Sequence, residues 1–417
     1  MKRKVLGLIF MTGVIVAVFS LTTAFAINLT PVEGLGKHLF FDKISDPDWV
    51  SCASCHDPDE GWTGAVSGIN NHGAVYRGAV PTRFGNRKPP SAAYATLSPI
   101  FYFDDGEGLF VGGNFWDGRA TGERLGNPAA DQALGPFLNH VEQNNPSKQA
   151  VCKQVEKSKY AGLFEEVWGP GSLDCSSAGI EAMYDQIGLS IAAYEGSSEV
   201  NQFSSKYDAF LAGDVELSEE EAWGKELFEG KAMCSACHPT AIASPLTDFT
   251  YDNLGVPKNP ENPFYDMDEV YLDDGSPINP LGADWVDPGL GGFLSTRPEW
   301  SDMASDNMGK HKVPTLRNVG KGNGGGFSKA YAHNGYFKSL KGIVHFYNTR
   351  DVKPQCPDPF TTEKDALRLG CWPVAEVVEN VNSDELGDLG LTDAEEDAIV
   401  VFLETLSDGF KVKEKVK

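Results

Sequence analysis

The sequence is poor in basic residues, with 35 Lys and Arg against 59 Asp and Glu and a net charge of −24. Such an acidic surface repels phosphate backbones, which argues against nucleic-acid binding. It suits a basic protein partner, although excess acid also serves solubility alone. With 41% hydrophobic and 23% charged residues the chain is neither disordered nor collagen-like. A globular protein of two or three domains is expected from 417 residues.

Long hydrophobic runs are also scarce, because one apolar stretch, residues 5–21, is the only one that approaches membrane-spanning length. It follows the basic residues 2–4 and precedes Ala24-Phe25-Ala26, a small-x-small cleavage site. This order is typical of a secretory signal peptide over residues 1–26 and predicts export to the periplasm. An uncleaved membrane anchor is the alternative. Cleavage after Ala26 would change the net charge from −24 to −27.

Cysteine is sparse, yet four of the eight cysteines fall in two Cys-x-x-Cys-His motifs, 52–56 and 234–238. This motif attaches c-type haem: two thiols bond to the vinyl groups and the His reaches the iron. A thioredoxin-like redox pair does not need that His, and zinc would need further ligands nearby. Two covalently bound haems c are therefore predicted, with His56 and His238 as axial ligands. The attaching thiols are those of Cys52, Cys55, Cys234 and Cys237.

The other four cysteines are Cys152, Cys175, Cys356 and Cys371. In an oxidising compartment they can form two disulfides, with three possible pairings. Loop closure favours the local pairs Cys152–Cys175 and Cys356–Cys371. Free buried thiols are the alternative.

Strand signals are few, whereas helix signals recur around both haem motifs. Residues 36–40 (Gly-Lys-His-Leu-Phe) resemble residues 224–228 (Gly-Lys-Glu-Leu-Phe), and each segment follows a capping box. Leu35 with Leu39, and Trp223 with Leu227, would form the apolar faces. A capped helix from Thr392 ends the chain. The predicted fold is mainly α, with two cytochrome c-like haem domains and long loops, covering residues 27–205 and 206–417.

The chain resembles the bacterial dihaem cytochrome c peroxidase family, which includes MauG. The resemblance covers nearly the whole mature chain and rests on four segments besides the first haem motif. They are 35–42 (LGKHLFFD), 115–119 (FWDGR), 313–319 (VPTLRNV) and 332–335 (AHNG). It implies that hydrogen peroxide reacts at the N-terminal haem.

The resemblance also implies residues on the distal face of that haem. Gln132, Pro136 and Glu142 have the family's spacing, in which Pro follows the Gln by four residues and Glu by ten. A carboxylate over the iron can move the proton that peroxide cleavage requires, so Glu142 is the predicted acid–base group. Gln132 would orient peroxide, and Pro136 would form a rigid wall. Trp116 matches the family's Trp between the haems, although a buried Trp beside haem also serves packing.

Three further positions concern metal ligands. His72 lies where the peroxidases carry a distal His on a mobile loop; an exposed loop His is the alternative. Tyr347, 14 residues after His333, occupies the place of the Met ligand of ordinary members, as in MauG-like members. Phenolate favours oxidised iron, and thioether favours reduced iron. Met308 is the rival ligand, and His345 would point elsewhere on the helix. Lys88 replaces the Asn that binds calcium in the family, which leaves a calcium ion in doubt.

The sequence therefore predicts a periplasmic dihaem peroxidase of the MauG-like, Tyr-ligated branch. Electrons would come from a c-type cytochrome or cupredoxin, or from side chains of a protein substrate. A dihaem electron-transfer cytochrome without catalysis is the alternative. The oligomeric state is open, a homodimer being one option.

Overall fold

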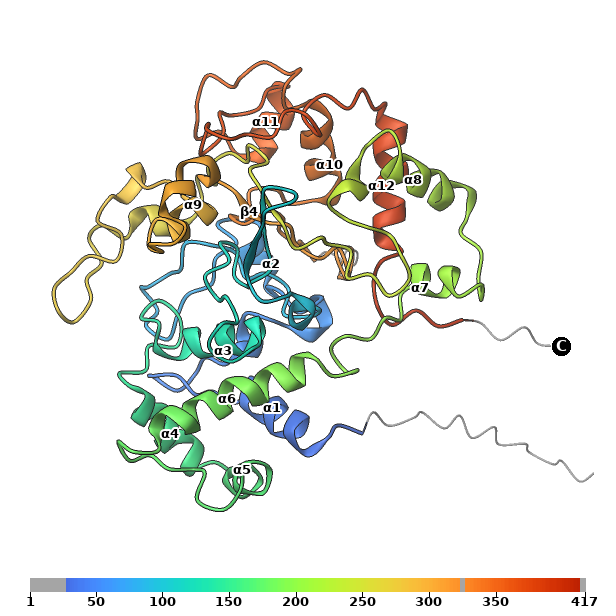
Figure 1. The fold of residues 1–417 in the computed structure, drawn as a ribbon. Coiled ribbons are helices and arrows are strands. Elements are labelled where there is room, and N and C mark those ends of the chain that lie inside the picture. The colour runs from blue at the N-terminus through green and yellow to red at the C-terminus, as the bar shows by residue number, and fades with distance from the viewer. Residues whose placement is uncertain (1–27, 323–326, 413–417) are drawn as a thin grey trace, which may run out of the picture.

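The computed structural model describes residues 28–322 and 327–412 (Figure 1), so the predicted signal peptide lies outside the described residues. The fold is mainly helical, which confirms the predicted class. The α-helices are α1 (Pro31–Phe41), α2 (Ser67–Asn70), α3 (Pro128–Leu138), α4 (Lys148–Glu156), α5 (Ala161–Trp168), α6 (Ile180–Glu195), α7 (Lys206–Leu211), α8 (Glu219–Glu229), α9 (Gly289–Leu294), α10 (Leu340–Thr349), α11 (Glu363–Leu369) and α12 (Asp393–Glu404). Among the described residues, no helix is long and apolar enough to cross a membrane.

The strands of the described part are short and form two antiparallel pairs. β1 (Tyr102–Asp104) pairs with β2 (Leu109–Val111). β3 (Tyr251–Asp252) pairs with β4 (His311–Lys312). Much of the remaining chain is loop, as expected where loops surround a large cofactor.

Three helices begin at the capping boxes that the sequence predicts. The hydroxyls of Thr30, Ser218 and Thr392 accept the backbone N–H three residues ahead, at 3.4, 3.2 and 3.3 Å. The Glu side chain at that position accepts the cap's own N–H in return. Two donors are satisfied in each box, so α1, α8 and α12 have well-defined starts.

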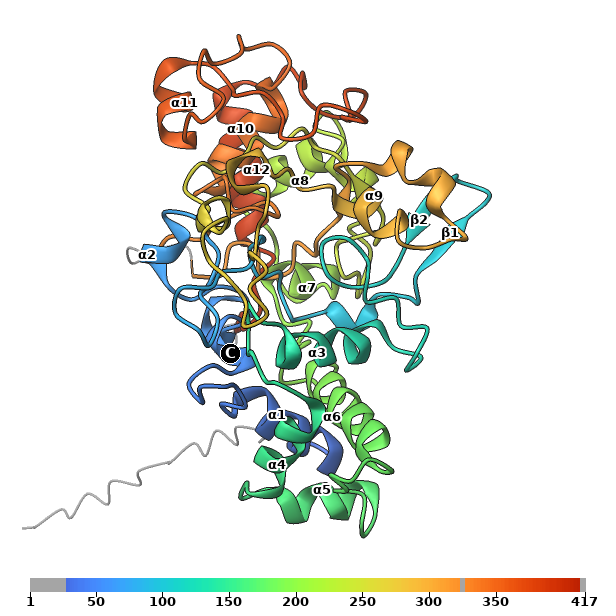
Figure 2. The ribbon, with the colours of Figure 1, turned by 90° about the vertical axis from the view of Figure 1, so that its left-hand side faces the viewer.

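Each haem motif lies beside a pair of crossing helices, α1 with α6 and α8 with α12 (Figures 1 and 2). The helices touch at a glycine in both pairs. A Cβ on Gly36 would lie 1.8 Å from the Ser190 oxygen, and one on Gly224 would lie 1.9 Å from the Ala398 oxygen. Only glycine permits such a close approach, so the repeated Gly-Lys-x-Leu-Phe segments mark the same crossing twice.

Two separate hydrophobic cores surround these helix pairs. One runs from Leu35 to Val200 and the other from Tyr207 to Leu406. The predicted boundary at 205/206 falls between them, and α1 and α6 lie at the opposite end of the molecule from α10 and α11 (Figure 2). The prediction for Trp223 was wrong: its side chain is 41% exposed, because the buried face of α8 is formed by Gly224, Leu227 and Phe228.

Buried polar contacts join the two halves. The Arg87 guanidinium donates to Asp117 of the first half and to both carboxylate oxygens of Asp287 in the second, each at 2.6 Å. The Tyr94 hydroxyl donates to Asp408 at 2.7 Å. A third apolar cluster combines Phe101 and Phe110 with Tyr251, Leu290 and Leu294. The two halves of the chain therefore meet over a buried interface.

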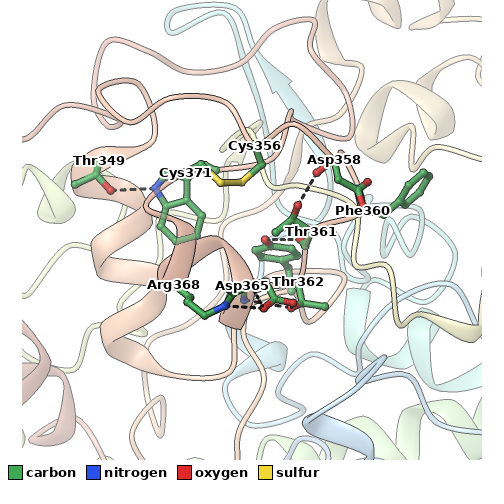
Figure 3. The surroundings of a disulfide bond; sticks show 11 residues. Thr349, Cys356, Asp358, Phe360, Thr361, Thr362, Asp365, Arg368 and Cys371 are labelled. Atoms are coloured by element: carbon green, nitrogen blue, oxygen red, sulfur yellow. Dashed lines mark hydrogen bonds and ion pairs between the residues drawn. A yellow bond between two sulfur atoms is a disulfide. The ribbon is translucent and has the colours of Figure 1, made fainter.

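Two disulfides are present, and each is local in sequence. Cys152 joins Cys175 inside the first core. Cys356 joins Cys371 and closes a loop that contains α11 (Figure 3). Thr362 caps α11 by accepting the Asp365 N–H, and the Arg368 guanidinium donates to the Asp365 carboxylate at 3.0 Å (Figure 3).

Candidate haem and peroxide site

Both Cys-x-x-Cys-His motifs open into one continuous cavity of about 440 Å³ between the domains. Its wall includes all four motif cysteines, which are not paired in disulfides. Both motif histidines also line it. The cavity therefore presents the cysteines and histidines of both motifs to one shared space.

The histidines are held in the form that binds iron. The Nδ1–H of His56 donates to the Trp62 oxygen at 3.2 Å, and that of His238 donates to the Leu246 oxygen at 2.8 Å. A carbonyl only accepts, so Nδ1 carries the proton and Nε2 keeps its lone pair for a metal. Burial lowers the pKa of His56 to about 4 and also lowers the pKa of His238. Neutral imidazoles beside cysteine pairs fit haem c.

Helix α3 brings two of the predicted distal residues to the cavity wall. Asn127 caps it and Pro128 occupies its first position, a favourable start. Gln132 and Pro136 are four residues apart, so they share one helix face, and both line the cavity. Pro136 has no N–H, and the helix ends two residues later at Leu138.

Glu142 follows α3 and also lines the cavity. The Asn139 amide donates to its carboxylate at 2.7 Å, and the Ala79 N–H donates to its backbone oxygen at 2.6 Å. A Cβ on Gly78 would lie 2.4 Å from the Val141 oxygen, so the glycine allows this close packing. Burial raises the pKa of the Glu142 carboxyl, against the opposing effects of Arg119 and Asn139. Glu142 is thus a positioned carboxyl that is easily protonated.

Tyr347 lies on α10 and lines the cavity together with the second haem motif. Its hydroxyl makes no hydrogen bond with any described residue, and burial raises its pKa. Met308 does not line the cavity; it packs near Gly291 of α9. The Nδ1–H of His345 donates to a Glu396 carboxylate oxygen at 2.9 Å, and His345 does not line the cavity either. Of these three side chains, only Tyr347 faces the predicted haem space.

Trp116 lies between the domains and is 8% exposed. Its indole N–H donates to the Lys88 oxygen at 2.8 Å, and its backbone oxygen accepts the Lys312 N–H at 2.8 Å. Its ring meets that of His333 edge-on, with centroids 6.5 Å apart. Trp116 therefore joins residues of both domains in the cavity wall that both haem motifs share.

His72 lies apart from the cavity, with a side chain that is 70% exposed. Its Nδ1 is 2.8 Å from a Glu261 oxygen, and Asn259 and Lys338 donate to its backbone oxygen. In this structure His72 does not face the N-terminal haem space, because second-domain residues hold its segment at the surface. Its ligation in another state of the loop stays a prediction.

The comparisons with known proteins agree with this geometry. A family model described as di-haem cytochrome c peroxidase matches residues 31–216. The chain is 33% identical over 390 residues to the methylamine utilization protein MauG of Paracoccus denitrificans, covering 90% of this chain and 88% of that protein. The chain belongs to the dihaem cytochrome c peroxidase family. It is a dihaem peroxidase, an oxidoreductase, as predicted.

Two further similarities support this assignment. The peroxidase is 26% identical to the cytochrome-c peroxidase IdrP2 of Denitromonas iodatirespirans, over 96% of this chain and 89% of that one. The solved diheme peroxidase BthA of Burkholderia thailandensis matches with a TM-score of 0.69 and 28% identity, covering 92% of this chain and 87% of that chain. A structure of its Y463M variant matches with a TM-score of 0.70.

Several charged residues of the peroxidase's cavity were missed as site candidates, Arg119 and Glu195 among them. Arg119 ends the Phe-Trp-Asp-Gly-Arg segment, and its guanidinium lies over the Phe115 ring at 3.8 Å. Glu195 is buried at the end of α6. The sequence carries a weak signal that Glu195 is buried. Glu195 follows the apolar Ile191 by one helical turn, so the two side chains share one helix face.

A buried cluster at the domain interface was also missed. Ligand-type atoms of Asp287, His311 and His333 lie within 4.8 Å of one another. The two imidazoles stack at 3.5 Å and 8°, and their in-plane lone pairs cannot both aim at an ion between parallel rings. Asp287 is already paired with Arg87, which together with His311 outweighs burial and holds its pKa well below the ordinary value. We therefore assign no metal to this cluster.

Proposed function

We propose that this peroxidase carries two covalent haems c and belongs to the Tyr-ligated branch of its family. Cys52 and Cys55 would attach the N-terminal haem, with His56 as axial ligand. Cys234 and Cys237 would attach the C-terminal haem, with His238 and Tyr347 as the two axial ligands. The observation that carries this proposal is that Tyr347 lines the cavity with the second haem motif and its hydroxyl has no hydrogen-bond partner among the described residues, whereas Met308 lies elsewhere.

The distal residues then divide the acid–base work on hydrogen peroxide. When bound, the N-terminal haem supplies an iron that binds peroxide and electrons that break its O–O bond. Glu142 accepts the proton of the inner peroxide oxygen and returns it to the departing oxygen, which leaves as water. Asn139 holds the carboxylate in place through its 2.7 Å hydrogen bond. Gln132 orients the peroxide, and Pro136 adds no competing donor.

Trp116 would couple the two domains electronically, since it touches both and borders the shared cavity. Lys88 supplies a positive charge in the same region. Its ammonium donates to Thr63 Oγ1 and the Pro89 oxygen, both at 3.0 Å, and burial lowers its pKa to about 8. An ammonium at this place offers no lone pair to calcium while it stays protonated.

We place the enzyme in the periplasm, where haem c attachment and two disulfides are compatible. The reducing equivalents come either from a small c-type cytochrome or cupredoxin, or from side chains of a protein substrate, which are oxidised as they give up electrons. The strongly acidic chain favours a donor with a basic surface.

The ligand assignment is tested with Tyr347→Met and Tyr347→Phe. The oxidised wild-type protein should lack the near-infrared band of Met-to-iron charge transfer, and it should react with one equivalent of peroxide without prior reduction. Tyr347→Met should gain that band and raise the potential of the C-terminal haem. Tyr336→Phe is the matched control, because Tyr336 is buried in the same core but donates to the Thr361 oxygen outside the cavity. A Met-type band in the wild type would exclude Tyr347 as the ligand.

A further inference from the structure

Glu195 is a carboxyl that the peroxidase mechanism above does not use. It is the last residue of α6, is 4% exposed and lines the cavity beside Ile191 and the first haem motif. Its carboxyl makes no hydrogen bond or ion pair with any described residue. Burying a carboxyl without a partner costs several kcal/mol when charged, so a purely structural position would favour an apolar side chain.

The second domain shows that apolar side chain at the matching position. Gly36 meets Ser190 and Tyr194 of α6 in the same way that Gly224 meets Ala398 and Phe402 of α12. The next residue along each helix is then Glu195 in the first domain and Leu403 in the second. Both line the cavity, and Leu403 is 5% exposed. This packing position therefore accepts leucine in the second half of the chain. In the first half the same position carries a carboxyl, which borders the N-terminal haem space.

In the part of the chain that the structure describes, no neighbouring positive charge compensates Glu195. The two groups electrostatically coupled to it are Cys52, a thioether once haem is attached, and Tyr194, whose hydroxyl donates to Glu199. The elements packed on α6 are α1, α3, α4 and the turn Ala95–Leu97, which has no titratable side chain. The charged groups of the three helices, and those of α6 itself, contact other residues. These contacts are Glu33–Thr30, Lys37–Glu199, His38–Tyr160, Asp131–Leu125, Lys148–Glu181, Lys153–Glu156 and Asp185–Arg124.

We propose that Glu195 exchanges a proton with the oxidation state of the N-terminal haem. It holds the proton while that haem is reduced and releases it to the solvent when the haem loses one electron to the oxidant. One electron and one proton thus leave together, and both return on reduction, so the net charge of the pocket is unchanged. In a medium of low dielectric constant this compensation is favourable. The inference rests on the proposed haem attachment at Cys52 and Cys55.

The environment places this exchange near neutral pH. Burial raises the pKa of Glu195 to about 8, with no opposing charge. An additional positive charge on the oxidised haem lowers the pKa, and its removal on reduction raises it. Between those two pKa values, the midpoint potential falls by about 59 mV per pH unit, the one-electron equivalent of a tenfold change in proton concentration.

The test is a potentiometric titration of the holoenzyme with redox mediators from pH 5 to pH 10, with the N-terminal haem followed by its own EPR signal. In the wild type, the midpoint potential of the N-terminal haem should fall with pH at the slope given above. Glu195→Gln and Glu195→Leu, which installs the residue of the second domain, should remove it, and Glu195→Asp should retain it. Glu199→Gln is the control, since Glu199 is near but outside the cavity. The slope should also persist in Glu142→Gln, which changes the cavity carboxyl proposed to act on peroxide.

A pH-independent potential in the wild type, or an unchanged slope in Glu195→Gln, would overturn the proposal. Redox-induced infrared difference spectra give a second measurement: a carboxyl C=O band should appear on reduction and be missing in Glu195→Gln. The mass and visible spectrum of each variant report whether two haems are attached. In the wild type, a missing haem would refute the proposed attachment, whereas two attached haems with a pH-independent potential would refute the role of Glu195 alone.

Discussion

Asp117 and the cavity residue Glu142 are two carboxyls whose surroundings move their pKa values in opposite directions. Burial disfavours the charge of both. At Asp117, however, the Arg87 and Arg119 guanidinium groups lie within 2.7 Å and hold its pKa below the ordinary value. The Glu142 carboxyl is hydrogen-bonded to one amide, that of Asn139. Burial outweighs this hydrogen bond and the charge of Arg119, so the pKa of Glu142 is raised. Asp117 is therefore a permanently charged structural group, and Glu142 is the one suited to proton transfer.

Glu142→Gln should keep both haems and lower the rate of the peroxide reaction by roughly 10²-fold or more, the usual scale for losing an acid–base group. The carboxylate is the proton acceptor and its pKa is raised. The wild-type rate should therefore rise with pH through a value above that of an ordinary Glu, and the variant should lack this inflection. Stopped-flow absorbance at several pH values measures both effects. Glu123→Gln, at an exposed pair with Arg297, is the control. A variant as fast as the wild type would exclude Glu142 from the reaction.

At the scale of elements, two helix crossings position the two haem motifs. In each crossing a capped helix approaches its partner through a single glycine, and the following Leu and Phe are buried. The capping boxes define where α1 and α8 begin, and the glycines define how closely α6 and α12 approach. Because the first motif follows α1 after ten residues and the second follows α8 after four, these two features help to locate the motif histidines.

Gly36→Ala should destabilise the protein by about 1–3 kcal/mol, the usual cost of overpacking, because its Cβ would meet the Ser190 oxygen. Gly34→Ala is the matched control on the same helix: nothing lies within 4 Å of its Cβ, and alanine favours a helix by up to about 1 kcal/mol. Chemical denaturation of the two holo-variants measures the difference. Equal stabilities would show that α1 can move away from α6 without loss.

At the scale of the whole molecule, the features with measurable consequences are the covalent links and the net charge. The two disulfides close local loops, one in each domain. We expect the mature protein to have the mass of residues 27–417 plus two haems, less four hydrogens. Intact mass spectrometry, with and without reduction and alkylation, measures the cleavage site, the number of attached haems and the number of disulfides. Four thiols that react with the alkylating reagent without reduction would contradict the disulfides, and retained residues 1–26 would contradict cleavage.

The acidic surface has a kinetic consequence. The net charge of −24, or −27 after cleavage, should attract a basic c-type cytochrome, so kcat/KM for that donor should fall by roughly tenfold or more as ionic strength rises. The reaction with peroxide alone should depend little on salt, because peroxide is neutral. Steady-state kinetics over a salt series measures kcat/KM for the donor, and stopped-flow absorbance measures the rate of the reaction with peroxide. A donor reaction that does not respond to salt would show that charge does not guide docking.

The sequence alone determined what depends on neighbouring residues. The capping boxes at Thr30, Ser218 and Thr392 form because a hydroxyl and a Glu three residues apart can bond within one helical turn. The helical class follows from these signals and from the repeated segment around Gly36 and Gly224. The family followed from motif order along the chain.

The tertiary structure decided what depends on distant segments. His72 is at the surface because Asn259, Glu261 and Lys338 hold it there. The exposure of Trp223 and the burial of Glu195 depend on how each helix meets its partner. The stacked His311 and His333 are 22 residues apart, and Asp287 beside His311 takes its own ion-pair partner, Arg87, from the other half of the chain. Such contacts form only when the domains pack, because burial and charge at a residue are set by all the segments that surround it.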